Sequence, residues 1–240
     1  MPLLQSEAAA KRLLLISNST MFDEMYLGHA AGEIDSFLGE IRHLLFIPFA
    51  LRDHDGYTRQ AASRFDAMGR ALTSAHHSAD PAAAVQRAEA IFVGGGNTFR
   101  LLQGLYRWKL LEPIRRRVDE GIPFIGSSAG SIVACPTIRT TKDMPIVEPP
   151  SLTALGLVGF QISPHYLDPD PSSRHMGETQ EERISQYLEE NDEHVVGLRE
   201  GGMVRVEAGA ISLKGRSAAR IFRRGHEPVE VSPETRLDLG

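Results

Sequence analysis

Short apolar runs alternate with longer amphipathic segments through the first two thirds of the chain. The runs are short and almost continuously apolar, as in strands covered on both faces, and they fall at residues 12–17, 43–48, 72–76, 91–93 and 122–126. The segments between them place apolar residues three or four positions apart, which predicts helices at residues 24–39, 57–72, 82–90 and 113–120. This alternation predicts an α/β fold with a mostly parallel sheet and helices on both of its faces.

The last third of the chain has a different pattern. Residues 178–190 are typical of one more helix, and residues 195–198 are typical of a strand. From Gly202 onward, apolar and polar residues alternate between glycines, which predicts a C-terminal antiparallel β meander. Because no linker interrupts the pattern, we expect one domain over residues 1–240.

Composition narrows the class of protein. The 240 residues carry 26 Lys and Arg against 31 Asp and Glu, a formal net charge of −5, and 42% are hydrophobic. These values are those of an ordinary globular chain and disfavour a disordered protein or one that binds nucleic acid. No apolar run is long enough to cross a membrane, no export signal precedes the first strand, and the single cysteine, Cys135, can form no internal disulfide. We therefore expect a cytoplasmic protein without a membrane partner.

The strongest local signal is the GxSxG sequence at residues 126–130, directly after a predicted strand. In a nucleophile elbow, a tight turn between strand and helix exposes one serine hydroxyl, and flanking glycines prevent clashes with neighbouring elements. The pattern places Ser128 at the centre of the turn and favours it over Ser127. The backbone N–H of Ala129 would face an oxyanion formed at the substrate. The alternative is an ordinary strand-to-helix turn in which Ser128 is the N-cap.

A second oxyanion donor is predicted in the glycine loop that follows the strand at residues 91–93. The loop contains Gly95 and Gly96, and in a parallel sheet it would lie at the same edge as Ser128. No Gly-Lys-Ser/Thr follows it, and Phe99 stands where a dinucleotide-binding fingerprint requires glycine, so phosphate binding is disfavoured. A simple glycine turn is the remaining alternative.

A catalytic serine needs a histidine to accept its proton and a carboxylate to orient that histidine. His165 ends an apolar strand, as Ser128 does, and we predict it as the base. Asp143 lies in the loop between the two and is the predicted orienting carboxylate, with Glu148 as an alternative. His76 and His77 suggest at most a weak metal site, because no third ligand follows at the spacing of zinc proteases; we expect no metal and no cofactor. Cys135 is expected to be a packed core residue.

Several segments in one order resemble the peptidase E family of aspartyl dipeptidases. They are LISNST (15–20), FIPFA (46–50), IFVGGGNTF (91–99), GSSAG (126–130), ACPTIRTTKDMPIV (134–147), Pro-His (164–165) and GETQEERI (177–184). The resemblance runs from about Leu13 to Leu198. It implies a three-layer α/β/α sandwich similar to class I glutamine amidotransferases, and a serine peptidase that cleaves Asp-Xaa dipeptides without a metal. Members of the family can form homodimers.

Carried over by position, the resemblance makes Ser128 the nucleophile, His165 the general base and Asp143 the residue that orients the histidine. Gly95, Gly96 and Ala129 match the oxyanion hole. Two positions depart from relatives: Ser127 stands where many have tryptophan, which would alter the wall of the cleft, and Gln180 stands where some have arginine.

A substrate aspartate needs a cationic partner, and a planar guanidinium pairs best with a carboxylate. Arg139 and Arg183 are the candidates, each with a solvated or structural arginine as the alternative. Three rival functions stay open. They are an α/β-hydrolase esterase, a cyanophycinase-like or isoaspartyl peptidase, and a binding module that keeps the fold without activity.

Overall fold

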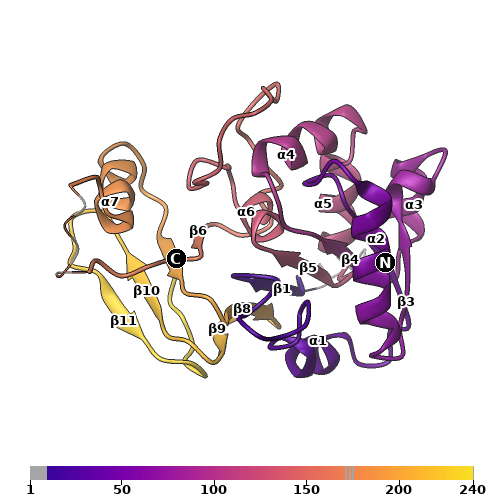
Figure 1. Ribbon diagram of the computed structural model, residues 1–240, viewed down its shortest axis with the longest axis horizontal. Helices are drawn as coiled ribbons and strands as arrows, with labels where there is room; N and C mark the ends of the chain where they lie inside the picture. Colours follow the sequence, from indigo (N-terminus) through magenta and orange to yellow (C-terminus); the bar gives the residue numbers. More distant parts are fainter. Residues whose placement is uncertain (1–9, 171, 173, 175, 240) are drawn as a thin grey trace, which may run out of the picture.

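A seven-stranded sheet forms the centre of the computed structural model, which describes residues 10–239 except 171, 173 and 175 (Figure 1). In spatial order its strands are β3 (Ala71–Ser74), β2 (His43–Ile47), β4 (Ile91–Val93), β5 (Phe124–Ser127), β1 (Leu13–Ile16), β8 (Gly202–Glu207) and β9 (Ala210–Gly215). The first five are parallel, and β8 and β9 extend the sheet as an antiparallel hairpin. The predicted mostly parallel sheet is confirmed.

Two groups of helices cover the two faces of this sheet (Figure 1). One face carries α1 (Ala31–Leu38) and α2 (His54–Asp66); the other carries α3 (Pro81–Arg87), α4 (Thr98–Arg107), α5 (Leu111–Asp119) and α6 (Ala129–Ala134). The central strand β1 shows why the strands are apolar throughout. Leu13 and Leu15 join the cluster under α3–α6, whereas Leu14 and Ile16 join the cluster under α1 and α2. Alternate side chains point to opposite faces, and both faces are buried, which gives the expected three-layer sandwich.

A second, four-stranded sheet lies beside the first (Figure 1). Its order is β11 (Val229–Val231), β10 (Ala219–Phe222), β7 (Val195–Leu198) and β6 (Gln161–Pro164), and α7 (Gln180–Glu190) packs on it. Strands β6 and β7 are parallel, so their carboxyl ends meet at one edge. The predicted C-terminal meander is antiparallel as expected, but its strands divide between the two sheets: β8 and β9 join the large one, β10 and β11 the small one.

Some helix boundaries differ from the prediction. The helix expected over residues 24–39 covers only Ala31–Leu38, because Leu27 has a φ of 54°, which breaks a right-handed helix. The helix expected over residues 57–72 begins earlier, where the side chain of Asp53 caps the N–H of Gly56, and ends at Asp66. Helix α4 was not predicted, and a 3₁₀ turn, η1 (Ala75–His77), follows β3.

The main hydrophobic cluster includes buried residues of both sheets, such as Leu13 of β1 and Ile162 of β6. The single domain predicted over residues 1–240 extends beyond the described residues at both ends and stays a prediction. Within the described ranges, no helix is long and apolar enough to cross a lipid bilayer.

Candidate active site

Ser128 occupies a strained turn between β5 and α6. Its φ of 53° and ψ of −112° are rarely adopted by a residue with a side chain, and such strain is typical of a nucleophile elbow. The flanking glycines are required by close packing. A Cβ on Gly126 would lie 2.5 Å from the carbonyl oxygen of Gly130, and a Cβ on Gly130 would lie 2.1 Å from that of Val93. The GxSxG sequence therefore folds as its pattern predicts.

The hydroxyl of Ser128 contacts the imidazole of His165. Ser128 Oγ lies 2.9 Å from His165 Nε2, and both side chains are only partly buried. His165 follows β6 and also has a positive φ, 51°. The geometry brings together the two residues that the sequence predicted, 37 positions apart, as nucleophile and base.

A carboxylate completes the chain of hydrogen bonds, and it belongs to Glu200. Glu200 Oε1 lies 2.7 Å from His165 Nδ1, on the side of the ring opposite Ser128. Glu200 follows β7, the parallel neighbour of β6, so the two strands deliver their side chains to the same edge. The exposed fractions of the His165 and Glu200 side chains are 41% and 47%, which leaves the pair open to solvent.

The prediction that Asp143 orients His165 is wrong in this structure. Asp143 Oδ2 instead accepts hydrogen bonds from the backbone N–H of Thr98 at 2.7 Å and from Thr98 Oγ1 at 2.6 Å. Asp143 therefore fastens its loop to the first residue of α4, just after the glycine loop. The alternative, Glu148, is exposed, and its backbone carbonyl accepts a hydrogen bond from Gln103.

Sequence reasoning missed Glu200, although a signal was present. Glu200 stands two residues beyond the predicted strand at 195–198, the same kind of position that singled out His165. What the pattern could not show is that β7 lies directly beside β6, because a strand's neighbours are set by the tertiary fold.

The carboxyl end of β1 holds His165 and Glu200 in place. The buried hydroxyl of Ser17 accepts the backbone N–H of His165 at 2.9 Å and donates to the carbonyl of Leu198 at 2.8 Å. The buried side chain of Asn18 accepts the N–H of Gly201, next to Glu200, at 2.8 Å. Hydrogen bonds from the two residues after β1 thus fix the backbone at the carboxyl ends of both β6 and β7.

Of the predicted oxyanion donors, Ala129 follows Ser128 in the chain and Gly95 packs against it. A Cβ on Gly95 would lie 3.1 Å from Ser128 Cβ, so the glycine loop directly adjoins the serine. In the described chain, the N–H groups of Gly95, Gly96 and Ala129 donate to no backbone carbonyl. The Gly95 N–H interacts with the buried hydroxyl of Tyr57, whose pKa is raised by burial and lowered in part by this contact. Gly96 and Ala129 thus remain the better candidates, and their role stays a prediction.

The two arginines predicted for substrate binding lie in different surroundings. Arg139 is exposed and close enough to Tyr187 to lower its pKa, which burial otherwise raises. Arg183 is exposed on α7, and its Nε lies 3.6 Å from Glu178 Oε2. The charge of Arg183 contributes to the lowered pKa of Lys142, about 8, for which burial of the ammonium group is the first cause.

Lys142 is a cation at the site that the sequence did not single out. Its Nζ donates to the carbonyl of His165 and to Gln180 Oε1, both at 3.1 Å, and Gln180 Nε2 also donates to the carbonyl of His165. Gln180, the departure noted in the sequence, therefore supports the backbone of His165. Ser127, the other departure, is fully buried, and its hydroxyl has no hydrogen-bond partner among the residues that the structure describes. The expectation that serine in place of tryptophan alters the wall of the cleft stays a prediction.

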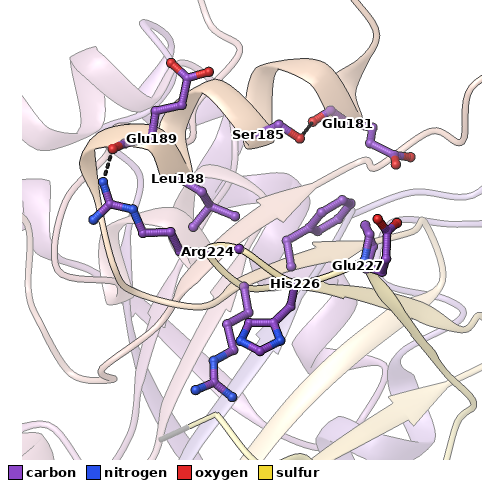
Figure 2. Close-up of a pocket in the computed structure, with 11 residues that line it drawn as sticks. Glu181, Ser185, Leu188, Glu189, Arg224, His226 and Glu227 are labelled. Atoms are coloured by element: carbon purple, nitrogen blue, oxygen red, sulfur yellow. Dashed lines mark hydrogen bonds between the residues drawn. The ribbon is translucent and has the colours of Figure 1, made fainter.

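Two further features lie apart from Ser128. Cys135 is fully buried, as predicted, and burial raises the pKa of its thiol to about 12. A cavity of about 590 Å³ lies between α7 and the turn joining β10 to β11, where Arg224 reaches the carbonyl of Glu189 (Figure 2). Its lining includes none of Ser128, His165 and Glu200.

Comparison with known proteins agrees with this geometry. The model of the family described as peptidase family S51 matches residues 13–214. Peptidase E of Streptomyces coelicolor is 51% identical over 220 residues, which cover 92% of this chain and 90% of that protein. A probable alpha-aspartyl dipeptidase of Drosophila melanogaster is 44% identical over 229 residues, covering 94% and 95%.

Two solved structures share the fold. One is a putative peptidase E protein from Listeria monocytogenes, with a TM-score of 0.67, 22% identity, and coverage of 87% of this chain and 100% of that one. The other is a peptidase from an acI-B1 Actinobacterium, with a TM-score of 0.72, 16% identity, and coverage of 96% and 97%. The family match over most of the sequence and the identity to curated relatives lead to one conclusion: the chain belongs to peptidase family S51.

Proposed function

We propose that this protein is a serine peptidase that hydrolyses dipeptides with an N-terminal aspartate through an acyl-enzyme. The observation that carries the proposal is the continuous chain of contacts from Ser128 Oγ through the His165 ring to Glu200 Oε1. The relatives named peptidase E and alpha-aspartyl dipeptidase supply the substrate class.

The first half of the reaction forms an ester on Ser128. Its oxygen attacks the carbonyl carbon of the N-terminal aspartyl residue while its proton moves to His165 Nε2. The carboxylate of Glu200 stabilises the imidazolium, and backbone N–H groups beside Ser128 stabilise the oxyanion. When the tetrahedral intermediate collapses, the C–N bond breaks, and the leaving amine takes the proton from His165.

Water completes the cycle. His165, now neutral, accepts a proton from a water molecule that attacks the aspartyl ester. The second tetrahedral intermediate collapses, the proton returns to Ser128 Oγ, and free aspartate leaves. The side chains of His165 and Glu200 are both exposed by more than two fifths, so this pair is open to solvent water.

The acidic substrate side chain requires a cation near Ser128, and Arg183 fits this requirement better than Arg139. The charge of Arg183 helps to lower the pKa of Lys142, whose ammonium group contacts the carbonyl of His165. Arg139 lies near Tyr187 instead. Replacing Arg183 with alanine should reduce the preference for Asp-Leu over Ala-Leu and spare acyl transfer, whereas Arg139→Ala is the matched control. An unchanged preference in both variants would contradict the assignment of the pocket.

The direct test is hydrolysis of a panel of Xaa-Leu dipeptides by the wild type and by Ser128→Ala. We expect preference for Asp-Leu and a loss of about 10⁶-fold in kcat in the variant, since serine and histidine act as a unit. Isoaspartyl dipeptides and p-nitrophenyl acetate test the cyanophycinase-like and esterase alternatives. A fluorophosphonate that fails to label Ser128 in active protein would contradict the mechanism.

A further inference from the structure

A second cluster of reactive side chains lies at the carboxyl end of β3, outside the proposed catalytic residues. Asp55 belongs to the first turn of α2, and His76 and His77 form the end of η1. Asp55 Oδ1 lies 3.0 Å from His76 Nε2 and 2.8 Å from His77 Nε2, and the centroids of the two imidazole rings are 3.9 Å apart. One carboxylate oxygen thus faces two ring nitrogens.

These separations are close to those of a metal-binding site. In a tetrahedral zinc site with bonds of about 2.0–2.2 Å, neighbouring ligand atoms lie about 3.3 Å apart. The three candidate atoms all lie within 4.8 Å of one another, and the two separations from Asp55 need to widen by only a few tenths of an ångström. Three protein ligands of the type His₂Asp leave room for solvent as a fourth ligand.

The surroundings hold one ligand in the required orientation. Ser74, a buried residue of β3, has its Oγ 2.7 Å from His76 Nδ1, which leaves Nε2 of that ring facing Asp55. A hydrogen bond to the ring nitrogen away from the ion is the usual support of a metal-bound histidine. Ser74 is itself fixed by strand pairing, since it lies opposite Phe46 of β2.

The cluster is open on its other side. The side chains of His77 and Asp55 are 59% and 66% exposed, whereas that of His76 is 15% exposed. An ion can therefore enter from solvent and keep water in its remaining coordination positions. The neighbouring ring of His54 packs edge-on against the ring of His76, with the two centroids 5.3 Å apart.

We propose that Asp55, His76 and His77 bind a divalent transition-metal ion, with Zn²⁺ as the expected occupant, through Oδ1 and the two Nε2 atoms. The ion would connect the 3₁₀ turn after β3 to the start of α2, two segments that are about 20 residues apart in sequence. Its role is structural, because the ligands are separate from Ser128, His165 and Glu200.

The test is metal titration of protein without an affinity tag, after treatment with a chelator and dialysis. We expect one Co²⁺ per chain with the absorption spectrum of a tetrahedral site, displaced by one equivalent of Zn²⁺, and a higher Tm with Zn²⁺ bound. Asp55→Asn and His77→Ala should weaken Zn²⁺ binding by at least about 10-fold, and Ser74→Ala by about 10- to 100-fold.

Matched controls separate this site from others. Asp66→Asn, at the other end of α2, and His226→Ala, in the exposed turn after β10, should bind Zn²⁺ as the wild type does. All variants should keep the circular dichroism spectrum and the Asp-Leu hydrolysis of the metal-free wild type. The proposal is overturned if the wild type binds no stoichiometric Co²⁺ or Zn²⁺, which would leave only hydrogen bonds in the cluster. It is also overturned if binding survives in Asp55→Asn and disappears in His165→Ala.

Discussion

Replacing Glu200 with alanine tests which carboxylate orients His165. The change removes the acceptor 2.7 Å from His165 Nδ1 and leaves the hydroxyl of Ser128 in contact with Nε2. A hydrogen bond to a charged group contributes about 1.5–3 kcal/mol, and about 1.4 kcal/mol corresponds to tenfold in rate. We therefore expect kcat for Asp-Leu to fall by about 10- to 150-fold. The effect is smaller than the roughly 10⁴-fold typical of a buried triad acid, because Glu200 is half exposed.

The matched variant is Asp143→Asn. Its carboxylate accepts two hydrogen bonds from Thr98 and is partly buried, so the substitution should lower stability by about 1.5–3 kcal/mol, or about 3 to 12 °C in Tm. Glu200→Ala should leave Tm nearly unchanged. If Asp143→Asn loses activity, that loss should be explained by its lower stability.

The assay combines dipeptide hydrolysis, thermal unfolding and rescue by added formate. Because the position of Glu200 is open to solvent, formate should restore part of the activity of Glu200→Ala and none of that of Asp143→Ala. The reasoning is refuted if Glu200→Ala keeps the wild-type kcat. It is equally refuted if Asp143→Asn loses activity at wild-type Tm and Asp143→Ala is rescued by formate, which would return the orienting role to Asp143.

Three further predictions concern packing and protonation. Gly130→Ala should destabilise the fold by more than about 2 kcal/mol in urea unfolding, because the added Cβ meets the carbonyl of Val93; a wild-type midpoint would contradict the close approach. Competitive acetylation should give Lys142 a pKa of about 8 in native protein and near 10.4 in urea. Between these values the native state binds fewer protons, so this group makes stability rise with pH. Cys135 should react with a thiol reagent only on unfolding, because burial raises its pKa to about 12; fast labelling of native protein would show the residue to be accessible.

The local sequence pattern correctly predicts the strands that border the site. The strand at 195–198 has the predicted bounds, and the strand before Ser128 lies within two residues of its predicted place. These strands are apolar because both sheet faces are covered, and that requirement is visible in a few consecutive residues. Helix ends were less accurate because they depend on caps and on positive φ values such as that of Leu27.

Contacts between side chains that are far apart in the sequence could not be predicted from local pattern. The place of Asp143 between Ser128 and His165 in the sequence favours it as the orienting carboxylate, yet in the folded protein Asp143 binds Thr98. The third member of the proposed metal cluster, Asp55, could not be recognised beside His76 and His77, because it comes from the preceding helix about 20 residues earlier. In both cases, the position of a residue in the sequence gave no information about which residues lie beside it in the folded protein.

By itself, the sequence determined a parallel sheet with covered faces, an exposed serine at a glycine-flanked turn, and a histidine at a strand end. Each of these is a local property, governed by side-chain size, burial and backbone freedom within a few residues. The tertiary structure decided that β7 lies beside β6, and so that Glu200, 35 residues beyond His165, is the carboxylate that meets the ring. That choice depends on strand order and register, which arise only when the two sheets pack together.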